Sequence, residues 1–248
     1  MRISLLFLGL LSLTLCSSEQ EAHHPPHWSY EGATGPDHWG DLSPDYAKCK
    51  TGGEQSPINI TSSVASDLPA IEFHYTESVL KIINNGHTVQ VNSDGRSSMT
   101  VGGKQYKLLQ FHFHHPSEEQ MSGKSNDMVI HLVHQDAEEH KAVIAVLVDQ
   151  GPRNSVIKTI FSHLPQTSEG EVTTGAAINP AGLLPKTDSY YTFPGSLTTP
   201  PCSEGVTWFV LKQPLTVSQS ELEKFAKLYP HNARPVQPLH QRTVLSTR

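Results

Sequence analysis

Short runs in which apolar and polar residues alternate recur along most of the chain, and this period of two predicts β-strands. Strands are expected at residues 71–75, 79–83, 87–91, 99–101, 106–114 and 128–134, with apolar runs at 142–148 and 206–211 predicting buried strands. Asn84-Asn85-Gly86 and Gly102-Gly103 are turn signals. Helical spacing is confined to residues 155–163 and 218–228, where Ser218 and Glu221 form a capping box.

The composition agrees with many short strands joined by turns. Glycine and proline contribute 17 and 18 residues, and only 17% of the chain is charged, which disfavours a helical bundle. No repeat, low-complexity tract or change of composition marks a second domain. The net charge of −6, without a basic patch, disfavours nucleic-acid binding.

The first 18 residues have the pattern of a secretory signal peptide. Met1-Arg2 supplies a positive charge, residues 3–15 are apolar, and Cys16-Ser17-Ser18 suits cleavage after Ser18. A lipoprotein signal through Cys16 is the weaker interpretation, because Leu15 is bulky. The apolar run is too short to span a membrane, and no later run is long enough. Residues 19–27 are expected to form a flexible arm, and residues 28–248 the folded domain.

Cleavage would leave two cysteines, Cys49 and Cys202. A pair in an exported protein most simply forms a disulfide, and two buried free thiols are the alternative. Asn59 begins a formal glycosylation sequon, to which we give little weight because such triplets arise often by chance.

Residues 109–131 contain the candidate chemistry. His112 and His114 are two apart in an expected strand, so both side chains point to one face, and His131 follows in the next apolar run. Three neutral imidazoles leave a fourth tetrahedral position open, which is typical of catalytic zinc. By the same alternation His115 and His134 point away from this site.

Three further side chains are expected beside these histidines. Gln110 shares the face of His112 and is placed to accept its free ring N–H, which would fix the tautomer. Val133 shares the face of His131 and is expected to line an apolar pocket. Glu118, just after Pro116-Ser117, is the best acidic partner for a hydrogen-bond relay.

From about residue 28 to 245 the chain resembles the exported α-class carbonic anhydrases. The segments that support this are Gly35-Pro36, His38-Trp39, Gln55-Ser56-Pro57-Ile58, Asn85-Gly86-His87, residues 110–114, Pro116-Ser117-Glu118, residues 131–134 and residues 196–202. The resemblance implies a mainly β (α+β) fold: a single domain around a large twisted, mostly antiparallel central sheet with a few peripheral short helices. It also implies reversible hydration of CO₂ to bicarbonate and a proton by zinc-bound hydroxide, with esterase activity as a possible side reaction.

The resemblance also assigns roles to individual residues. It implies that His112, His114 and His131 bind Zn²⁺, and that Thr198 links the zinc-bound hydroxide to Glu118. Thr199 would shape the bicarbonate end of the pocket. The wall that holds CO₂ would consist of Val133, Val143, Leu197, Val206 and Trp208.

Proton release is assigned to a second group of residues. His87 matches the proton shuttle of the family, since an imidazole titrates near neutral pH. Tyr30, Asn85 and Gln90 would order the water between it and the zinc. Cys49 and Cys202 match the disulfide of exported members.

One position departs from the family pattern. Relatives usually carry Glu two residues before the third ligand, where this chain has Val129. Valine cannot accept the free N–H of His131, so a carbonyl, a water or Asp127 is expected instead. Because such partners affect metal affinity, the hypothesis is that zinc is held less tightly here than in relatives with Glu.

A non-enzymatic function is the alternative, since some members of this superfamily are storage or binding proteins. These usually lack zinc histidines, whereas all three are present here with Glu118 and Thr198. The expected partner is CO₂ or bicarbonate, with no nucleic acid and no membrane, in an exported monomer or dimer.

Overall fold

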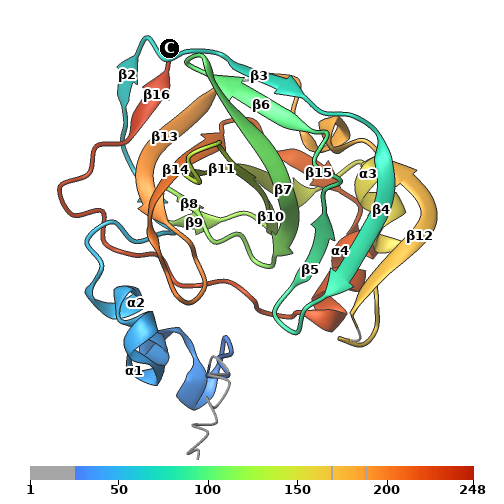
Figure 1. Cartoon of the computed structure of the whole chain (residues 1–248), viewed down its shortest axis with the longest axis horizontal. Helices are drawn as coiled ribbons and strands as arrows, with labels where there is room; N and C mark the ends of the chain where they lie inside the picture. The colour runs from blue at the N-terminus through green and yellow to red at the C-terminus, as the bar shows by residue number, and fades with distance from the viewer. Residues whose placement is uncertain (1–25, 169, 188) are drawn as a thin grey trace, which may run out of the picture.

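Three adjacent strands form the middle of the sheet, in a computed structural model that describes residues 26–168, 170–187 and 189–248 (Figure 1). Strand β10 (Met128–Gln135) pairs antiparallel with β7 (Lys104–His114) on one side and with β11 (Lys141–Gln150) on the other. The register places His131 opposite His112. The predicted metal ligands therefore lie at the centre of the sheet.

The large sheet runs in the order β12-β4-β5-β7-β10-β11-β14-β13-β16-β2. Most of its pairs are antiparallel, and the parallel pairs are β11–β14, β11–β15 and β16–β2. The remaining strands of this sheet are β2 (Val64–Ser66), β3 (Ile71–His74), β4 (Ser78–Asn84), β5 (Val89–Asn92), β6 (Ser98–Val101), β12 (Glu171–Ile178), β13 (Tyr190–Ser196), β14 (Glu204–Leu211), β15 (Leu215–Val217) and β16 (Leu245–Thr247). The short strands β1 (Asn59–Ile60), β8 (Gln120–Met121) and β9 (Lys124–Ser125) form a separate small sheet. The predicted fold class is confirmed.

The helices are short and peripheral, as expected. They are α1 (Trp39–Leu42), α2 (Lys48–Thr51), α3 (Ser155–Phe161) and α4 (Gln219–Leu228), with 3₁₀ turns at Gly32–Thr34, Pro36–His38, Pro44–Tyr46 and Pro180–Leu183. The capping box of α4 is present, with Ser218 and Glu221 bonded reciprocally. No helix among the described residues is long and apolar enough to cross a membrane.

Strands β12 and β13 were not predicted from the sequence. In β12 apolar and polar residues do not alternate, and even Val172 is exposed. Strand β13 contains Pro194 and Gly195, which favour turns. Strand β5 begins at Val89, later than predicted. The Asn85 Oδ1 accepts the backbone N–H groups of His87 and Thr88, and this turn replaces the start of the strand.

The two faces of the sheet bury separate apolar clusters. Alternate residues of β10 and β11, such as Ile130 and Ile144, join a large cluster that also contains residues of α3 and α4. The residues between them, such as Val129 and Val143, join a smaller cluster with Trp208. Because alternation sends the metal-site histidines to the face of this smaller cluster, the site is walled by apolar side chains.

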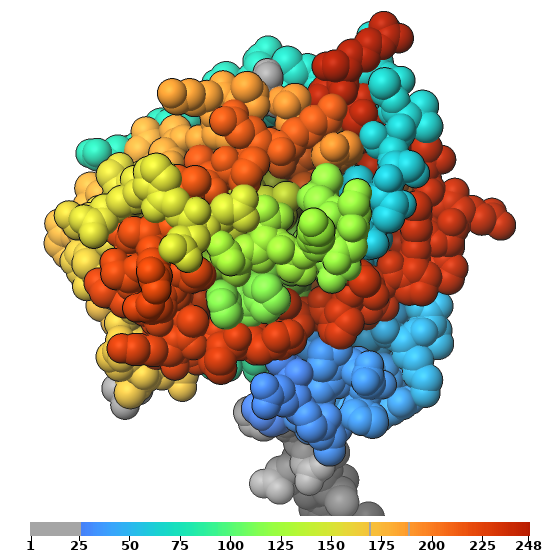
Figure 2. Space-filling view, turned by 180° about the vertical axis from the view of Figure 1, so that it is seen from behind, coloured from blue at the N-terminus to red at the C-terminus, as the bar shows by residue number. Residues whose placement is uncertain are grey.

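The N-terminal segment that carries α1 and α2 is fastened to the rest of the fold at two points. Cys49 and Cys202 form a disulfide with 5.0 Å between their Cα atoms, so the predicted pairing is confirmed. The buried Arg234 guanidinium donates to the carbonyls of Cys49 and Ser56 at 2.8 and 2.7 Å. In Figure 2 this blue segment lies against the red C-terminal part of the chain. The predicted signal peptide and most of the predicted arm lie outside the described residues.

We expect the double variant Cys49→Ser/Cys202→Ser to lower the free energy of unfolding by about 2–4 kcal/mol. The disulfide joins residues 153 positions apart and thereby restricts the unfolded chain. Guanidinium unfolding of wild type and variant measures the difference, and reduction of the wild type should reproduce it. Equal unfolding midpoints in all three samples would contradict the prediction.

Candidate active site

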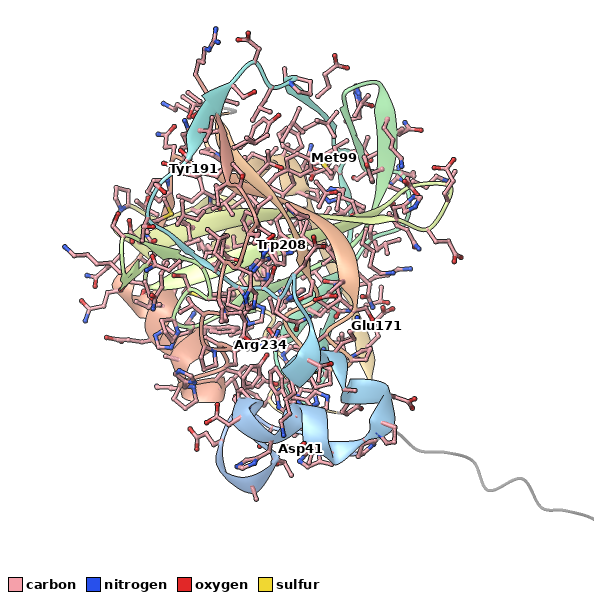
Figure 3. All side chains as sticks on the ribbon, turned by 90° about the vertical axis from the view of Figure 1, so that its left-hand side faces the viewer. Asp41, Met99, Glu171, Tyr191, Trp208 and Arg234 are labelled. Atoms are coloured by element: carbon pink, nitrogen blue, oxygen red, sulfur yellow. A yellow bond between two sulfur atoms is a disulfide. The ribbon has the colours of Figure 1, made fainter. Side chains whose placement is uncertain are left out.

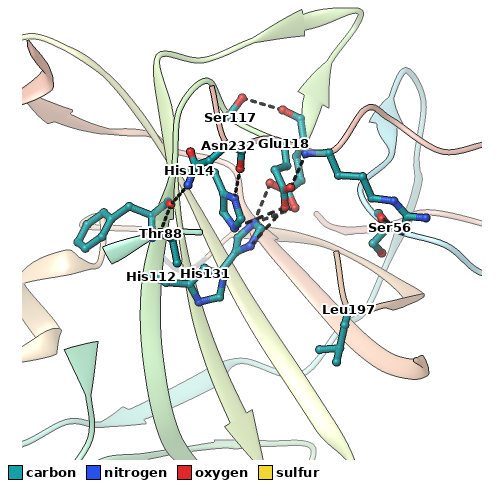
Figure 4. A network of polar contacts seen from close by, with 12 residues as sticks. Ser56, Thr88, His112, His114, Ser117, Glu118, His131, Leu197 and Asn232 are labelled. Atoms are coloured by element: carbon teal, nitrogen blue, oxygen red, sulfur yellow. Dashed lines mark hydrogen bonds and ion pairs between the residues drawn. The ribbon is translucent and has the colours of Figure 1, made fainter. Parts of the chain in front are cut away.

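Three imidazole rings converge on one point above β7 and β10 (Figure 4). His112, His114 and His131 each offer a ring nitrogen, and these atoms lie within 4.8 Å of one another. The ring centroids are 4.7–5.5 Å apart. His112 and His114 point the same way because they alternate along β7, and the β7–β10 register brings His131 beside them.

Each ring is oriented by an acceptor at its other nitrogen. His112 Nδ1 lies 2.8 Å from Gln110 Oε1, and His114 Nδ1 lies 2.7 Å from the backbone carbonyl of Asn232. His131 Nε2 lies 3.1 Å from both carboxylate oxygens of Glu119. Since these acceptors have no proton to give, each bonded nitrogen carries the N–H and the opposite nitrogen faces the common point.

This arrangement suits a divalent cation. The Nε2 of His114 is buried and has no hydrogen-bond partner among the described residues, which is costly for a polar atom without a ligand. Burial, followed by the neighbouring histidines, lowers the pKa of His112 to about 3 and that of His114 well below its usual value. Both rings are therefore neutral at physiological pH, the form that binds metal. The residues present fit Zn²⁺ with three nitrogen ligands.

Glu118 is fully buried beside the three histidines. Its Oε1 accepts the backbone N–H of Arg234 at 2.7 Å, and its Oε2 lies 3.6 Å from His114 Nε2. Burial raises the pKa of Glu118 to about 7, while His131, the Arg234 N–H and the Thr198 hydroxyl act to lower it. The predicted relay residues Glu118 and Thr198 are thus brought together.

A cavity of about 250 Å³ opens next to the histidines. It is lined by Leu109, Gln110, His112, His131, Val133, Lys141, Val143, Leu197, Thr198, Thr199 and Trp208. The Trp208 indole packs edge-on against the His131 ring at 4.9 Å, and its Nε1 donates to the carbonyl of Ser196. Figure 3 shows Trp208 near the middle of the fold. Five of these lining residues are apolar, and the polar ones are the two histidines, the two threonines, Gln110 and Lys141.

Comparison with known proteins places this site in a family. Residues 34–248 match the eukaryotic-type carbonic anhydrase family. A carbonic anhydrase of Neisseria gonorrhoeae is 44% identical over 95% of this chain and 94% of that protein. The solved complex of α-carbonic anhydrase from Thermovibrio ammonificans with the inhibitor sulfanilamide has 43% identity and a TM-score of 0.86, covering 89% of this chain and 99% of that one.

The chain belongs to the α-carbonic anhydrase family. As a carbonic anhydrase it is an enzyme, a lyase. The family is not uniform in name, because Dioscorin DB3L of Dioscorea polystachya is also 34% identical over 97% of this chain and 94% of that protein.

A second, smaller cavity of about 110 Å³ adjoins His112 and His114. Its walls include the four residues predicted for proton release, which are Tyr30, Asn85, His87 and Gln90. The His87 ring stacks on Trp28 at 3.6 Å. Burial, followed by the nearby His27, lowers the pKa of His87 below its usual value.

Other predicted positions lie elsewhere. Val206 is buried in the same apolar cluster as Trp208 but does not line the larger cavity. His134 bonds the Tyr75 hydroxyl at 2.8 Å, and the backbone carbonyl of Pro230 lies 2.9 Å from His115 Nδ1. Both histidines are therefore outside the three-histidine site. Asn59 bonds the backbone N–H of Gly123.

The structure corrects the expected acceptor for His131. Asp127 is not that acceptor, because its carboxylate accepts the backbone N–H of Gln150. Glu119 bonds His131 instead, although no spacing in the sequence relates it to that histidine. Its only signal was the second acidic residue of Ser117-Glu118-Glu119. Asn232, Arg234 and Lys141 also escaped notice, since they have no spacing that relates them to the histidines.

We expect excess Zn²⁺ to stabilise the metal-free protein by about 3 kcal/mol when free zinc is 100 times its dissociation constant. His114→Ala should abolish this stabilisation, because it removes a converging ring nitrogen. His115→Ala is the matched control. It should keep the response, because the His115 ring bonds the Pro230 carbonyl and is not one of the three converging rings. Thermal unfolding with and without zinc measures both, and equal responses in the two variants would contradict a three-histidine site.

Proposed function

We propose that this member of the α-carbonic anhydrase family catalyses the zinc-dependent, reversible hydration of CO₂ to bicarbonate and a proton. The observation that supports this proposal most is the convergence of three oriented histidine nitrogens beside an apolar cavity. A structural zinc site would be closed by a fourth protein ligand, whereas a set of three leaves room for chemistry.

His112, His114 and His131 would hold the zinc ion. When bound, Zn²⁺ lowers the pKa of water toward neutrality and so makes a nucleophile available at physiological pH; carbonic anhydrase is the standard example of this effect. The protein residues then position that nucleophile. Glu118, held by the Arg234 N–H, accepts a hydrogen bond from the Thr198 hydroxyl, which leaves the Thr198 oxygen free to accept a hydrogen bond from the nucleophile.

The apolar side of the cavity suits a substrate without charge. Val133, Val143, Leu197 and Trp208 present hydrocarbon surface beside the histidines, where CO₂ would be held by packing alone. Thr199 lies at the same cavity and is assigned to the bicarbonate product, which needs polar contacts. The same arrangement admits a small activated ester as a side substrate.

His87 is assigned to moving the released proton to solvent. It lies in the second cavity, which also contacts His112 and His114, and Tyr30, Asn85 and Gln90 supply polar atoms along the way. An imidazole whose pKa lies below its usual value gives up a proton readily at neutral pH. Water between these groups would complete the path.

We also propose that the protein is exported. The Cys49–Cys202 disulfide is typical of oxidising compartments, and the pattern of residues 1–18 is that of a signal peptide. The organisation into signal, arm and one catalytic domain, and a monomeric or dimeric state, remain predictions.

Stopped-flow CO₂ hydration by the purified, zinc-loaded protein tests the function. We expect hydration activity that a sulfonamide inhibits. His112→Ala should lower this activity by more than about 100-fold, which exceeds the loss expected when only a residue that supports a metal ligand is removed. His134→Ala is the matched control, since this histidine bonds Tyr75 on the opposite face. Stoichiometric zinc without hydration activity would overturn the proposal in favour of a storage or binding protein.

We expect His87→Ala to lower kcat in weak buffer by up to about 100-fold, because proton release then lacks an acid–base group. The ratio kcat/KM should change little, since the CO₂ cavity is intact. Added imidazole should restore kcat. The dependence of kcat on buffer concentration is the measurement, and a variant whose kcat is independent of buffer would show that His87 is not the shuttle.

A further inference from the structure

We propose that Glu119 is the positioning residue of the third metal ligand, His131, and that it governs how long zinc is retained. This inference rests on the zinc site proposed above. Glu119 lies in the bend before β8, and we assign to it the role of accepting the His131 ring N–H. Val129 of strand β10 cannot accept this N–H.

The contact between the two side chains is close and sheltered. Both Glu119 oxygens lie 3.1 Å from His131 Nε2, and Glu119 is 0% exposed. Every hydrogen bond of this carboxylate within the described residues goes to His131. A buried carboxylate is stable only with a donor, so Glu119 requires the N–H on Nε2 and leaves Nδ1 facing the other two histidines.

The bend that carries Glu119 is itself fixed. The Ser117 hydroxyl donates to the Glu119 carbonyl at 2.8 Å and accepts the backbone N–H of Asn126 at 2.8 Å. The next residue, Gln120, pairs with Asn59 in the small sheet. The carboxylate is therefore delivered from a constrained backbone and not from a flexible loop.

Strand β10 offers no competing acceptor. Val129 lies two residues before His131, on the same face, and is buried in the smaller apolar cluster. Asp127 is engaged by the Gln150 backbone. The carboxylate that supports His131 thus arrives from outside the strand, and position 129 extends the apolar wall.

The three supporting acceptors differ in charge. His112 is supported by an amide oxygen and His114 by a backbone carbonyl, whereas His131 is supported by a carboxylate. A carboxylate at the far nitrogen raises the basicity of the ligating nitrogen and restricts ring rotation. His131 should therefore be the ligand whose support contributes most to zinc retention.

Zinc loss to a strong chelator tests this role. We expect Glu119→Ala to speed dissociation about 10–100-fold, and Glu119→Gln, which keeps the shape and an amide oxygen, to have a smaller effect. Asp127→Asn is the matched control for loss of a nearby carboxylate and should leave the rate within about twofold. Equal rates for Glu119→Ala and wild type would overturn the proposal.

A carboxylate placed on strand β10 should restore zinc retention to the variant that lacks Glu119. In the Glu119→Ala background, Val129→Glu places an acceptor on the face of His131, and we expect zinc retention to recover toward the wild-type rate. Val129→Glu alone should instead destabilise the protein, because two carboxylates would then compete for one N–H. A double variant that loses zinc as fast as Glu119→Ala would count against the role of the carboxylate.

Nitrogen-15 NMR of the metal-free protein separates this inference from the proposed function. We expect the His131 Nε2–H signal in the wild type and its loss in Glu119→Ala, with the remaining spectrum reporting an intact fold. Failure of the wild type to bind zinc would refute the proposed function, while a persistent Nε2–H signal in Glu119→Ala would refute the role of Glu119.

Discussion

The pairing of β7 with β10 is the constraint on which the site depends. A strand alternates its side chains, so one register between two neighbours decides which residues meet. With His131 opposite His112, all three histidines project from one face, and the apolar residues between them fill the larger core on the other. A slip of one residue in β10 would exchange the two sets. The metal site and the core are therefore specified by the same backbone hydrogen bonds.

A buried polar segment near the C-terminus completes what the strands begin. The Asn232 carbonyl orients His114, and the Arg234 N–H holds Glu118. The Arg234 guanidinium continues to the carbonyls of Cys49 and Ser56 and lies 5.6 Å from the Trp39 ring. Figure 3 shows Arg234 between Trp208 and the helical segment that carries Asp41. Burial lowers the pKa of Arg234 to about 10, which is still well above neutral pH, so the guanidinium remains charged. These acceptors offset the cost of its desolvation.

Sequence reasoning succeeded where periodicity operates. Alternation within β7 and β10 separated His112, His114 and His131 from His115 and His134, and the capping box located the start of α4. It failed where the chain turns. Strand β13 contains Pro194 and Gly195, which favour turns. Asn232 and Arg234 reach His114 and Glu118 through backbone groups, so these two contacts do not depend on a side chain that could be recognised in the sequence. Long-range contacts of this kind leave no local pattern, and only the resemblance to a family linked Thr198 and His87 to the histidines.

Position 129 shows why the support of His131 cannot be judged from strand β10 alone. Within β10 the absence of a carboxylate two residues before His131 looks like the loss of a support. In three dimensions His131 lies between two consecutive carboxylates, with Glu118 3.8 Å from its Nδ1 and Glu119 3.1 Å from its Nε2. Glu118 faces Nδ1, the ring nitrogen directed at the other two histidines, so Glu119 is the carboxylate that accepts the N–H on Nε2. Since that nitrogen has one proton to donate, a carboxylate at position 129 in addition to Glu119 would add an unpaired buried charge, whereas the apolar Val129 packs in the smaller cluster.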